Sequence, residues 1–334
     1  MIENQSKNAA PLLEIKDLTV HYETEAGVVE AVNDVSLVLE KGESLALVGE
    51  TGAGKTTIAL SIMKQLPSPP ARIVDGTISM AGNGIFDMSE KELRNVRGST
   101  VSMIFQDPMT ALNPSMRVGD QVAEVIRLHR KCSKAEAVVL AQKTLGMVGI
   151  QSNRLRDYPH QFSGGMRQRV VIAIALACEP ELLIADEPTT ALDVTIQAQV
   201  LDLIRDLRKN LNTSMLLITH DFGIVAEMCD KCAIIYAGQI VESGSVRQIF
   251  TNYKHPYTKG LFESIPSLEG HADRLKPIRG LMANPMELPS YCSFSSRCEF
   301  CSAKCQQKDP ELIEVEPGHF VRCYHYEKIG GATP

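Results

Sequence analysis

The sequence contains no apolar run long enough to cross a membrane. The longest one, residues 170–178, has nine residues, whereas a membrane-spanning helix needs roughly 20. The N-terminal residues do not combine a basic segment with an apolar one, as an export signal does, so we expect the chain to stay inside the cell. Basic residues are not in excess either, because 34 Lys and Arg stand against 40 Asp and Glu. This balance disfavours binding to nucleic acid through net charge.

No internal repeat is present, and the composition is that of a folded globular protein. Apolar residues make up 44% of the 334 residues and charged residues 22%, which is enough material for two or three domains. Short apolar runs that alternate with glycine turns predict an α/β core from residues 1–106 and 163–244, with an antiparallel β subdomain in its N-terminal part. Apolar residues three and four apart predict a helical subdomain over residues 107–162. Residues 245–334, rich in proline and cysteine, are expected to form a separate small domain.

A glycine-rich motif, GETGAGKT at residues 49–56, follows a short apolar run and precedes a segment with helical character. It fits G-x-x-x-x-G-K-[ST], in which the glycines let backbone N–H groups surround phosphate oxygens. Lys55 can neutralise the β and γ phosphates, and the hydroxyl of Thr56 can bind Mg²⁺. The helix that follows adds the partial positive charge of its N-terminus. The motif predicts a nucleoside triphosphate site.

An acidic pair ends a second apolar run, LLIADEP at residues 182–188. Two carboxylates directly after four apolar residues indicate negative charge at the polar end of a buried strand. We expect Asp186 to hold Mg²⁺ and Glu187 to polarise the attacking water. Together the two motifs predict a P-loop NTPase fold that hydrolyses a nucleotide.

A third motif, QFSGGMRQR at residues 161–169, predicts a helix with Ser163 as its N-cap. Gly164 and Gly165 leave the first turn open to an anion. Since the chain already has one phosphate site, we expect these residues to bind the γ-phosphate of a nucleotide held by another subunit. A glycine-rich helix start without a ligand is the alternative for this segment taken alone.

With these three motifs in this order, nearly the whole chain resembles the ATP-binding cassette (ABC) ATPases, which have a RecA-like P-loop core. The resemblance implies further site residues. Gln106, in VSMIFQD, is similar to the Q-loop glutamine that contacts Mg²⁺ and the attacking water. His220, in LLITHD, is similar to the switch histidine that contacts the γ-phosphate. Asp193, at the end of the segment ALD, resembles the D-loop of the dimer interface, and Tyr22 matches an aromatic residue that stacks on adenine.

The resemblance also implies how the site works. ATP and Mg²⁺ are the expected cofactors, with Thr56 and Gln106 as Mg²⁺ ligands and with Glu187, His220 and Gln106 as catalytic residues. Two subunits, identical or related, are expected to close around ATP and to reopen after hydrolysis. The residues expected to bind the nucleotide are, within the loop, Gly49, Glu50, Thr51, Gly52, Ala53, Gly54, Lys55, Thr56 and Thr57, and outside it Tyr22, Gln106, Ser163, Gly164, Gly165, Asp186 and Asp193.

Two segments narrow the resemblance to importers of the peptide and nickel class. Residues 105–121 are similar to the stretch that docks on the permease, and residues 255–266, HPYTKGLFESIP, are similar to the start of the C-terminal extension of oligopeptide and dipeptide importer ATPases. In physical terms the second segment predicts an amphipathic helix that packs through Tyr257, Leu261 and Ile265.

This resemblance implies an ATPase subunit at the cytoplasmic face of the cell membrane that energises peptide import. Its partners would be a second ATPase subunit, two transmembrane permeases and, indirectly, an extracytoplasmic peptide-binding protein. Uptake of nickel or another solute by the same machinery is an alternative. An ATPase that handles nucleic acid is a second one, which the acidic net charge of −6 disfavours, so we expect no nucleic-acid partner.

Five of the nine cysteines lie within residues 292–323. Disulfides are disfavoured in a reducing cytosol, and an odd count is against them too. Three alternatives remain: a zinc site, an iron–sulfur cluster and unliganded thiols. Zinc sites usually show two C-x2-C pairs, whereas only Cys298 and Cys301 form one here. The spacing through Cys292, Cys298, Cys305 and Cys323 resembles the four-cysteine extension of peptide importer ATPases, some of which bind [4Fe–4S]. The resemblance therefore implies a [4Fe–4S] cluster on these four residues, with Zn²⁺ as the alternative and Cys301 outside the set.

Overall fold

The computed structural model describes residues 10–190, 192–265 and 277–330. The chain divides into two compact units. The first contains the residues up to Leu13 together with Val38–Ser44 and Ser79–Ile218, and the second contains Glu14–Leu37, Leu45–Ile78 and the residues from Thr219 onward. No helix in the described ranges has both the length and the apolar content needed to cross a membrane.

The first unit is built on three parallel strands with β7 (Leu182–Asp186) in the middle. It pairs on one side with β6 (Val101–Ile104) and on the other with β8 (Ser214–Thr219). Every residue of the three strands is buried, as continuous apolar strands in a parallel sheet should be. Asp186 therefore lies at the carboxyl end of a fully buried strand, where the sequence motif predicts it.

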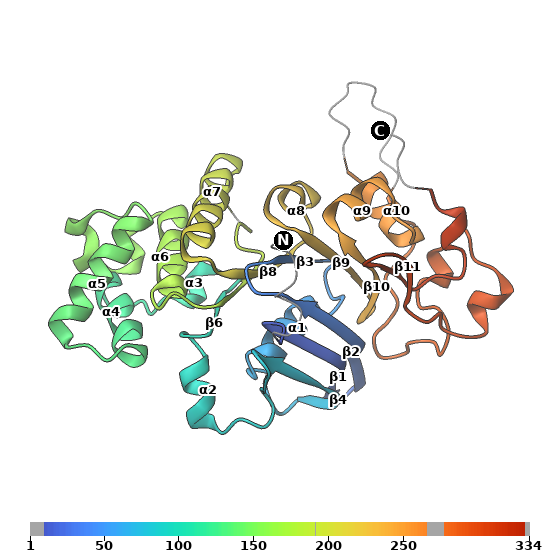
Figure 1. Cartoon of the computed structure of the whole chain (residues 1–334), viewed down its shortest axis with the longest axis horizontal. Helices are drawn as coiled ribbons and strands as arrows, with labels where there is room; N and C mark the ends of the chain where they lie inside the picture. The colour runs from blue at the N-terminus through green and yellow to red at the C-terminus, as the bar shows by residue number, and fades with distance from the viewer. Residues whose placement is uncertain (1–9, 191, 266–276, 331–334) are drawn as a thin grey trace, which may run out of the picture. The chain divides into compact units, whose positions relative to one another are not determined.

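Helices make up the rest of the first unit. A small hairpin strand β5 (Asn83–Gly84) and helix α2 (Glu90–Val96) precede β6, and α6 (Gly164–Leu176) and α7 (Val194–Leu211) flank β7 along the chain. Between β6 and α6 lie α3 (Pro108–Ala111), α4 (Val118–His129), α5 (Lys134–Met147) and the 3₁₀ turns η1 (Ser152–Arg156) and η2 (Pro159–Gln161). Helices α4, α5 and α6 pack against one another (Figure 1). Residues 107–162 thus contain helices, as the spacing of apolar residues predicts, and a capping box of Ser133 and Glu136 starts α5.

The second unit contains two groups of strands. In one sheet β2 (Gly27–Leu39), β1 (Leu13–Thr24) and β4 (Ala71–Met80) follow in that order. In the other, β3 (Ser44–Val48) pairs in parallel with β9 (Lys231–Tyr236), which pairs antiparallel with β10 (Gln239–Ser245). Helix α1 (Lys55–Ile62) follows β3 after the glycine-rich loop. The strand–loop–helix context that this motif requires is therefore present.

The C-terminal residues continue the second of these sheets. Strand β12 (His319–Val321) pairs antiparallel with β10, with Glu242 opposite Val321, and β11 (Ile313–Glu316) pairs antiparallel with β12. The expectation of a separate small domain after residue 244 is wrong in this respect, because the tail covers the free edge of β10. Strands of three and four residues are too short to show an alternating pattern, so no pattern in the sequence indicates them.

Helices and aromatic side chains join the tail to the rest of this unit. Helices α8 (Phe222–Met228), α9 (Val246–Thr251) and α10 (Pro256–Glu263) and the turns η3 (Ser295–Arg297), η4 (Ala303–Gln306) and η5 (Tyr326–Lys328) lie in this region. Tyr257 of α10 is fully buried and Leu261 packs on the same apolar cluster, as predicted. The prediction for Ile265 is wrong, since α10 ends at Glu263 and Ile265 is 43% exposed.

Candidate nucleotide site

The glycine-rich loop between β3 and α1 has a backbone that only glycine tolerates at several positions. Gly52 and Gly54 have φ angles of +85° and +104°, in the region that side chains disfavour. A Cβ on Gly49 would lie 2.3 Å from the carbonyl oxygen of Ile235, and one on Gly54 would lie 2.4 Å from that of Ala31. The loop is therefore packed tightly against neighbouring backbone on one side, which leaves its N–H groups to face a ligand on the other.

Lys55, the first residue of α1, is nearly buried with 7% exposure. Its Nζ donates hydrogen bonds to the carbonyl oxygens of Gly49 at 2.7 Å and Glu50 at 3.0 Å. The ammonium group is thus held over the loop, where it can meet phosphate oxygens. Two residues on, the hydroxyl of Thr57 lies 3.3 Å from the hydroxyl of Tyr22, so the residue predicted to stack on adenine lies beside the start of α1.

The acidic pair after β7 belongs to a hydrogen-bonded network. Asp186 is buried with 3% exposure. Glu187 has a φ of +44°, an uncommon conformation for a non-glycine residue that is found at functional sites. Its Oε2 accepts hydrogen bonds from Nε2 of Gln106 at 3.1 Å and from Oγ1 of Thr190 at 2.9 Å. The structure therefore brings together Gln106 and Glu187, which are 81 residues apart.

Thr190 is a contact residue that the sequence analysis missed. Its backbone N–H donates to the carbonyl oxygen of Glu187 at 3.1 Å, which closes a turn and points the hydroxyl back to the carboxylate. A hydroxyl residue three positions after the acidic pair is a local signal that could have identified it. Gln168 was missed too: it is 1% exposed and its Nε2 donates to the carbonyl oxygen of Pro188 at 2.6 Å, which ties α6 to this turn.

The SGG segment forms the N-terminus of α6. Ser163 is the N-cap and its Oγ accepts from the N–H of Met166 at 3.4 Å, which confirms the predicted cap. A Cβ on Gly165 would lie 2.5 Å from Cγ2 of Ile196, whereas the nearest atom of the described residues to a Cβ on Gly164 is Cδ2 of Leu192 at 3.9 Å. Packing against the described residues therefore explains Gly165 and does not require glycine at position 164.

The remaining predicted residues lie at other element ends. Asp193 is the N-cap of α7 and accepts from the N–H of Ile196 at 2.9 Å, while Ala191 lies outside the described residues. His220 follows β8 and is exposed. The first unit thus carries Gln106, the SGG segment, the acidic pair and Asp193, and the second carries Tyr22, the glycine-rich loop and His220.

Four cysteines of the tail line one small cavity, and they are the four of the predicted set: Cys292, Cys298, Cys305 and Cys323. Cys301 is not part of its lining. Burial raises the pKa of Cys292, Cys298 and Cys323 to about 12 in each case, so these thiols are protonated at neutral pH unless a metal displaces the protons. Within the described ranges no three Cys, His, Asp or Glu residues are grouped so that they could hold a metal ion.

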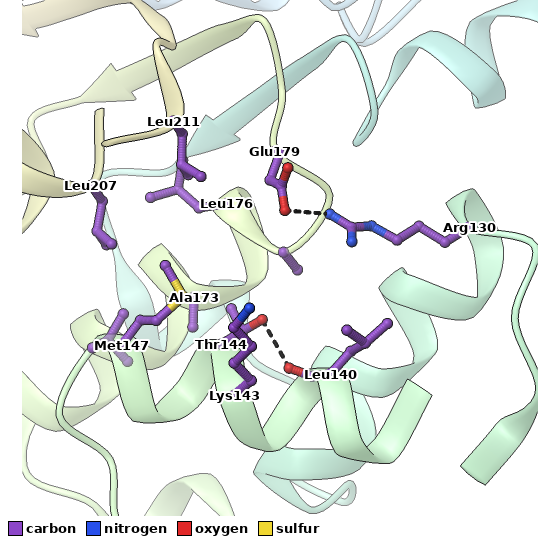
Figure 2. A pocket seen from close by; sticks show the side chains of 12 residues that line it. Arg130, Leu140, Lys143, Thr144, Met147, Ala173, Leu176, Glu179, Leu207 and Leu211 are labelled. Carbon is purple, nitrogen blue, oxygen red and sulfur yellow. Dashed lines mark hydrogen bonds and ion pairs between the residues drawn. The ribbon is translucent and has the colours of Figure 1, made fainter. Parts of the chain in front are cut away.

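A further pocket, in the first unit, holds none of the predicted residues. Its apolar lining comes from α5, α6 and α7, with Leu140, Leu176 and Leu207 among the residues that Figure 2 shows. At its rim Arg130 and Glu179 form an ion pair at 2.9 Å. This cavity is therefore distinct from the residues that the phosphate motifs single out.

Comparisons with known proteins agree with these features. The family model described as "ABC transporter" matches residues 32–190, and the model "Oligopeptide/dipeptide transporter, C-terminal region" matches residues 241–305. The oligopeptide transport ATP-binding protein AppD of Bacillus subtilis is 46% identical, covering 96% of this chain and 98% of that protein. OppD of the same organism is 48% identical, covering 94% and 88%. Among solved structures, the ATP-binding cassette MJ0796, a dimer bound to ADP and phosphate, matches with a TM-score of 0.62 and 25% identity, covering 70% of this chain and 99% of that one.

Proposed function

The chain belongs to the ATP-binding cassette family of transporter ATPases, and from this premise we propose that its ATP hydrolysis drives the import of dipeptides or oligopeptides. Relatives named as oligopeptide and dipeptide transport ATP-binding proteins match it at 46–48% identity over 94–96% of the chain. The match to the C-terminal region of such transporters begins at residue 241, within β10. The cargo thus follows from relatives that share the whole chain, rather than from the ATPase core alone.

The proposal that the protein hydrolyses ATP is supported above all by the hydrogen bonds around Glu187. Hydrogen bonds from Gln106 and Thr190 to Oε2 hold the carboxylate in one orientation, and a carboxylate oriented in this way can accept the proton of an attacking water. Lys55 and the N–H groups of the loop bind the phosphates, and His220 contacts the γ-phosphate. The oxygen donors of Thr56, Gln106 and Asp186 suit Mg²⁺, which when bound neutralises phosphate charge.

We infer a sandwich of two ATPase subunits, identical or related. Ser163, Gly164 and Gly165 of one subunit would bind the γ-phosphate held by the other, and Asp193 would lie at their interface. Among the described residues the nearest atom to a Cβ on Gly164 is Cδ2 of Leu192 at 3.9 Å, an ordinary contact. This supports the inference, because a glycine with room for a side chain fits close approach by an external group. The similar solved cassette is also a dimer.

The proposed partners on the membrane side are two permeases, which would place the protein at the cytoplasmic face. For the domains we propose the boundaries predicted above: a core of residues 1–106 and 163–244 with its antiparallel β subdomain, helices over 107–162, and a C-terminal extension from 245 whose strands join the sheet of the core. Residues 105–121 would dock on a permease, and Phe105 at their start is 40% exposed. The peptide-binding protein would act through the permeases.

Glu187→Gln tests the hydrolytic role. The amide cannot accept the proton, so we expect turnover to fall by about 10²–10⁴-fold while ATP still binds and holds the subunits together. Glu181→Gln, an equal change at an exposed residue that pairs with Lys41, is the control and should keep full activity. ATPase activity is measured in liposomes with both permeases and peptide-loaded binding protein. Undiminished turnover of Glu187→Gln, or stimulation by nucleic acid and none by the loaded importer, would refute the proposal.

We also propose that Cys292, Cys298, Cys305 and Cys323 hold a [4Fe–4S] cluster. The four thiols line one cavity, and four Cys thiolates are the usual ligand set of such a cluster; Zn²⁺ is the alternative. Such a cluster would tie together segments spread over residues 292–323. Cys298→Ala should lose iron and sulfide from anaerobically purified protein, and Cys301→Ala should retain both. Colourless protein with stoichiometric zinc would contradict the proposal.

A further inference from the structure

The second residue of the phosphate-binding loop, Glu50, is held by two side chains from the C-terminal extension. We propose that Arg297 and Tyr257 are positioning residues for ATP binding: they fix Glu50 and neutralise its charge, so that the loop receives the triphosphate in one conformation. The inference rests on the proposed ATPase function and adds to it a role for residues after 244 in the nucleotide site itself.

Arg297 makes a two-pronged ion pair with Glu50. Its Nη1 and Nη2 lie 2.8 and 3.1 Å from the two carboxylate oxygens, the paired geometry in which arginine binds a carboxylate most strongly. The guanidinium is itself anchored, because its Nε donates to the carbonyl oxygen of Arg279 at 3.0 Å. The Arg297 side chain is 4% exposed. The Glu50 side chain is 31% exposed, so the pair is partly buried and salt screens it less than a surface pair. Breaking it would leave the carboxylate without its counter-charge.

Tyr257 holds the backbone of the same residue. Its hydroxyl oxygen accepts a hydrogen bond from the N–H of Glu50 at 3.0 Å. The ring is fully buried and packs against the rings of Tyr236 and Phe294, with centroids 4.8 and 5.4 Å apart. Burial is the largest cause that raises the pKa of this phenol, so the hydroxyl stays neutral. The acceptor is therefore fixed by packing.

Glu50 is thus attached at three points. Tyr257 holds its N–H, Arg297 its carboxylate, and Lys55 of the motif donates to its carbonyl oxygen at 3.0 Å. The first two contacts span 207 and 247 residues of sequence. A carboxylate in a loop that binds a triphosphate repels the ligand unless its charge is matched, and the charge that matches it comes from the extension.

The test measures ATP affinity and turnover separately in the full protein with its permeases. Arg297→Met should raise the KM and the Kd for ATP about tenfold and leave kcat within about twofold, because Arg297 touches no reacting atom. Arg297→Lys keeps the charge without the paired geometry and should recover part of the loss. Tyr257→Phe keeps the ring and removes only the acceptor, and should raise the Kd about threefold.

A double variant and a control assign the effect to Glu50. In the Glu50→Gln background Arg297→Met should cause no further loss, since the charge that Arg297 matches is gone. Lys308→Met, which breaks an exposed ion pair with Glu311 in the same tail, should leave ATP affinity unchanged.

Four outcomes would overturn the inference: unchanged ATP affinity in Arg297→Met, equal losses with and without Glu50→Gln, no recovery in Arg297→Lys, or unchanged affinity in Tyr257→Phe. If Arg297→Met does not fold, Arg297→Lys and Tyr257→Phe decide the question on the same readout. Failure of the proposed function is a different result, because it would appear in the unaltered protein as turnover that peptide-loaded binding protein does not stimulate.

Discussion

Two serine caps in the first unit allow the role of Ser163 in a partner's nucleotide site to be separated from its role in folding. Ser163 caps α6 and Ser133 caps α5, and each accepts a hydrogen bond from the N–H three residues on, at 3.4 and 3.2 Å respectively. Ser133→Ala and Ser163→Ala therefore remove the same chemical group from the same position of a helix. They differ in that Ser163 belongs to the SGG segment proposed to bind a γ-phosphate.

The structure predicts opposite rankings for stability and activity. A serine cap contributes about 0.5–2 kcal/mol. Ser133 is part of a full capping box, with Glu136 accepting from its N–H at 2.7 Å, so Ser133→Ala should cost about 1 kcal/mol. The cap of Ser163 is near the distance limit of a hydrogen bond and should contribute about 0.5 kcal/mol. By contrast, losing one donor to the charge that develops in a transition state costs about 10²–10³ in rate, or about 3–4 kcal/mol, and this applies to Ser163→Ala alone.

Urea unfolding of each variant measures stability, and ATPase activity of the assembled transporter with peptide-loaded binding protein measures function. We expect Ser133→Ala to be the less stable variant with near-normal activity, and Ser163→Ala to be the nearly inactive one with near-normal stability. Activity of Ser163→Ala within threefold of the unaltered protein would refute the proposed contact. Loss of activity in proportion to loss of stability in both variants would refute it as well.

Two further predictions concern the start of α10. The buried carboxylate of Glu242 accepts hydrogen bonds from the N–H groups of Lys254 at 2.5 Å and His255 at 3.0 Å, one on each oxygen. In Glu242→Gln the amide NH₂ must face one of these donors, so the free energy of unfolding in urea should fall by about 1–3 kcal/mol. Glu314→Gln, at an exposed site, should lower it by less than about 0.5 kcal/mol, and equal losses in the two variants would refute this account. Burial lowers the pKa of His255 to about 3, below its value of about 6.5 in the unfolded chain. As pH falls, the unfolded chain takes up the proton first, so the free energy of unfolding of the unaltered protein should fall by about 2 kcal/mol between pH 8 and pH 5. His255→Asn keeps a capping acceptor and should not show this loss. Parallel plots of stability against pH for the two proteins would contradict this prediction.

Phosphate chemistry made part of the site predictable from sequence. The loop around Lys55 and the Ser163 cap each consist of neighbouring residues, because backbone N–H groups must converge on one anion from one turn. The acidic pair is contiguous because both carboxylates stand at the end of one buried strand. The strands that precede these motifs could be predicted as well, because buried parallel strands appear in a sequence as unbroken apolar runs. Gln106 could not be placed beside Glu187 by such local reasoning, and its assignment came from resemblance to a family.

Contacts made across long stretches of sequence escaped prediction. Strand β12 adds to the edge of β10 through a few backbone hydrogen bonds that leave no alternating pattern in three residues. The end of α10 before Ile265 has a local cause by contrast, because Pro266 disfavours helical backbone at the residue before it. The ion pair of Arg297 with Glu50 joins a residue of the phosphate-binding loop to an arginine 247 positions away that has no motif around it. The sequence around Arg297 does not indicate a contact with Glu50, and the sequence around Glu50 does not indicate one with Arg297.

These contacts show that the C-terminal extension is structurally connected to the phosphate-binding loop. If the extension were joined to the core only by a linker, removing the extension would leave the phosphate-binding loop unaltered. Here Tyr257 and Arg297 supply two of the three attachments of Glu50. Arg297 directly precedes Cys298, a residue that lines the four-cysteine cavity. Any rearrangement of that cavity which displaces the backbone at residue 298 must therefore either move the guanidinium or strain its ion pair, and in both cases the change reaches the nucleotide loop. The extension is in this sense part of the ATPase site.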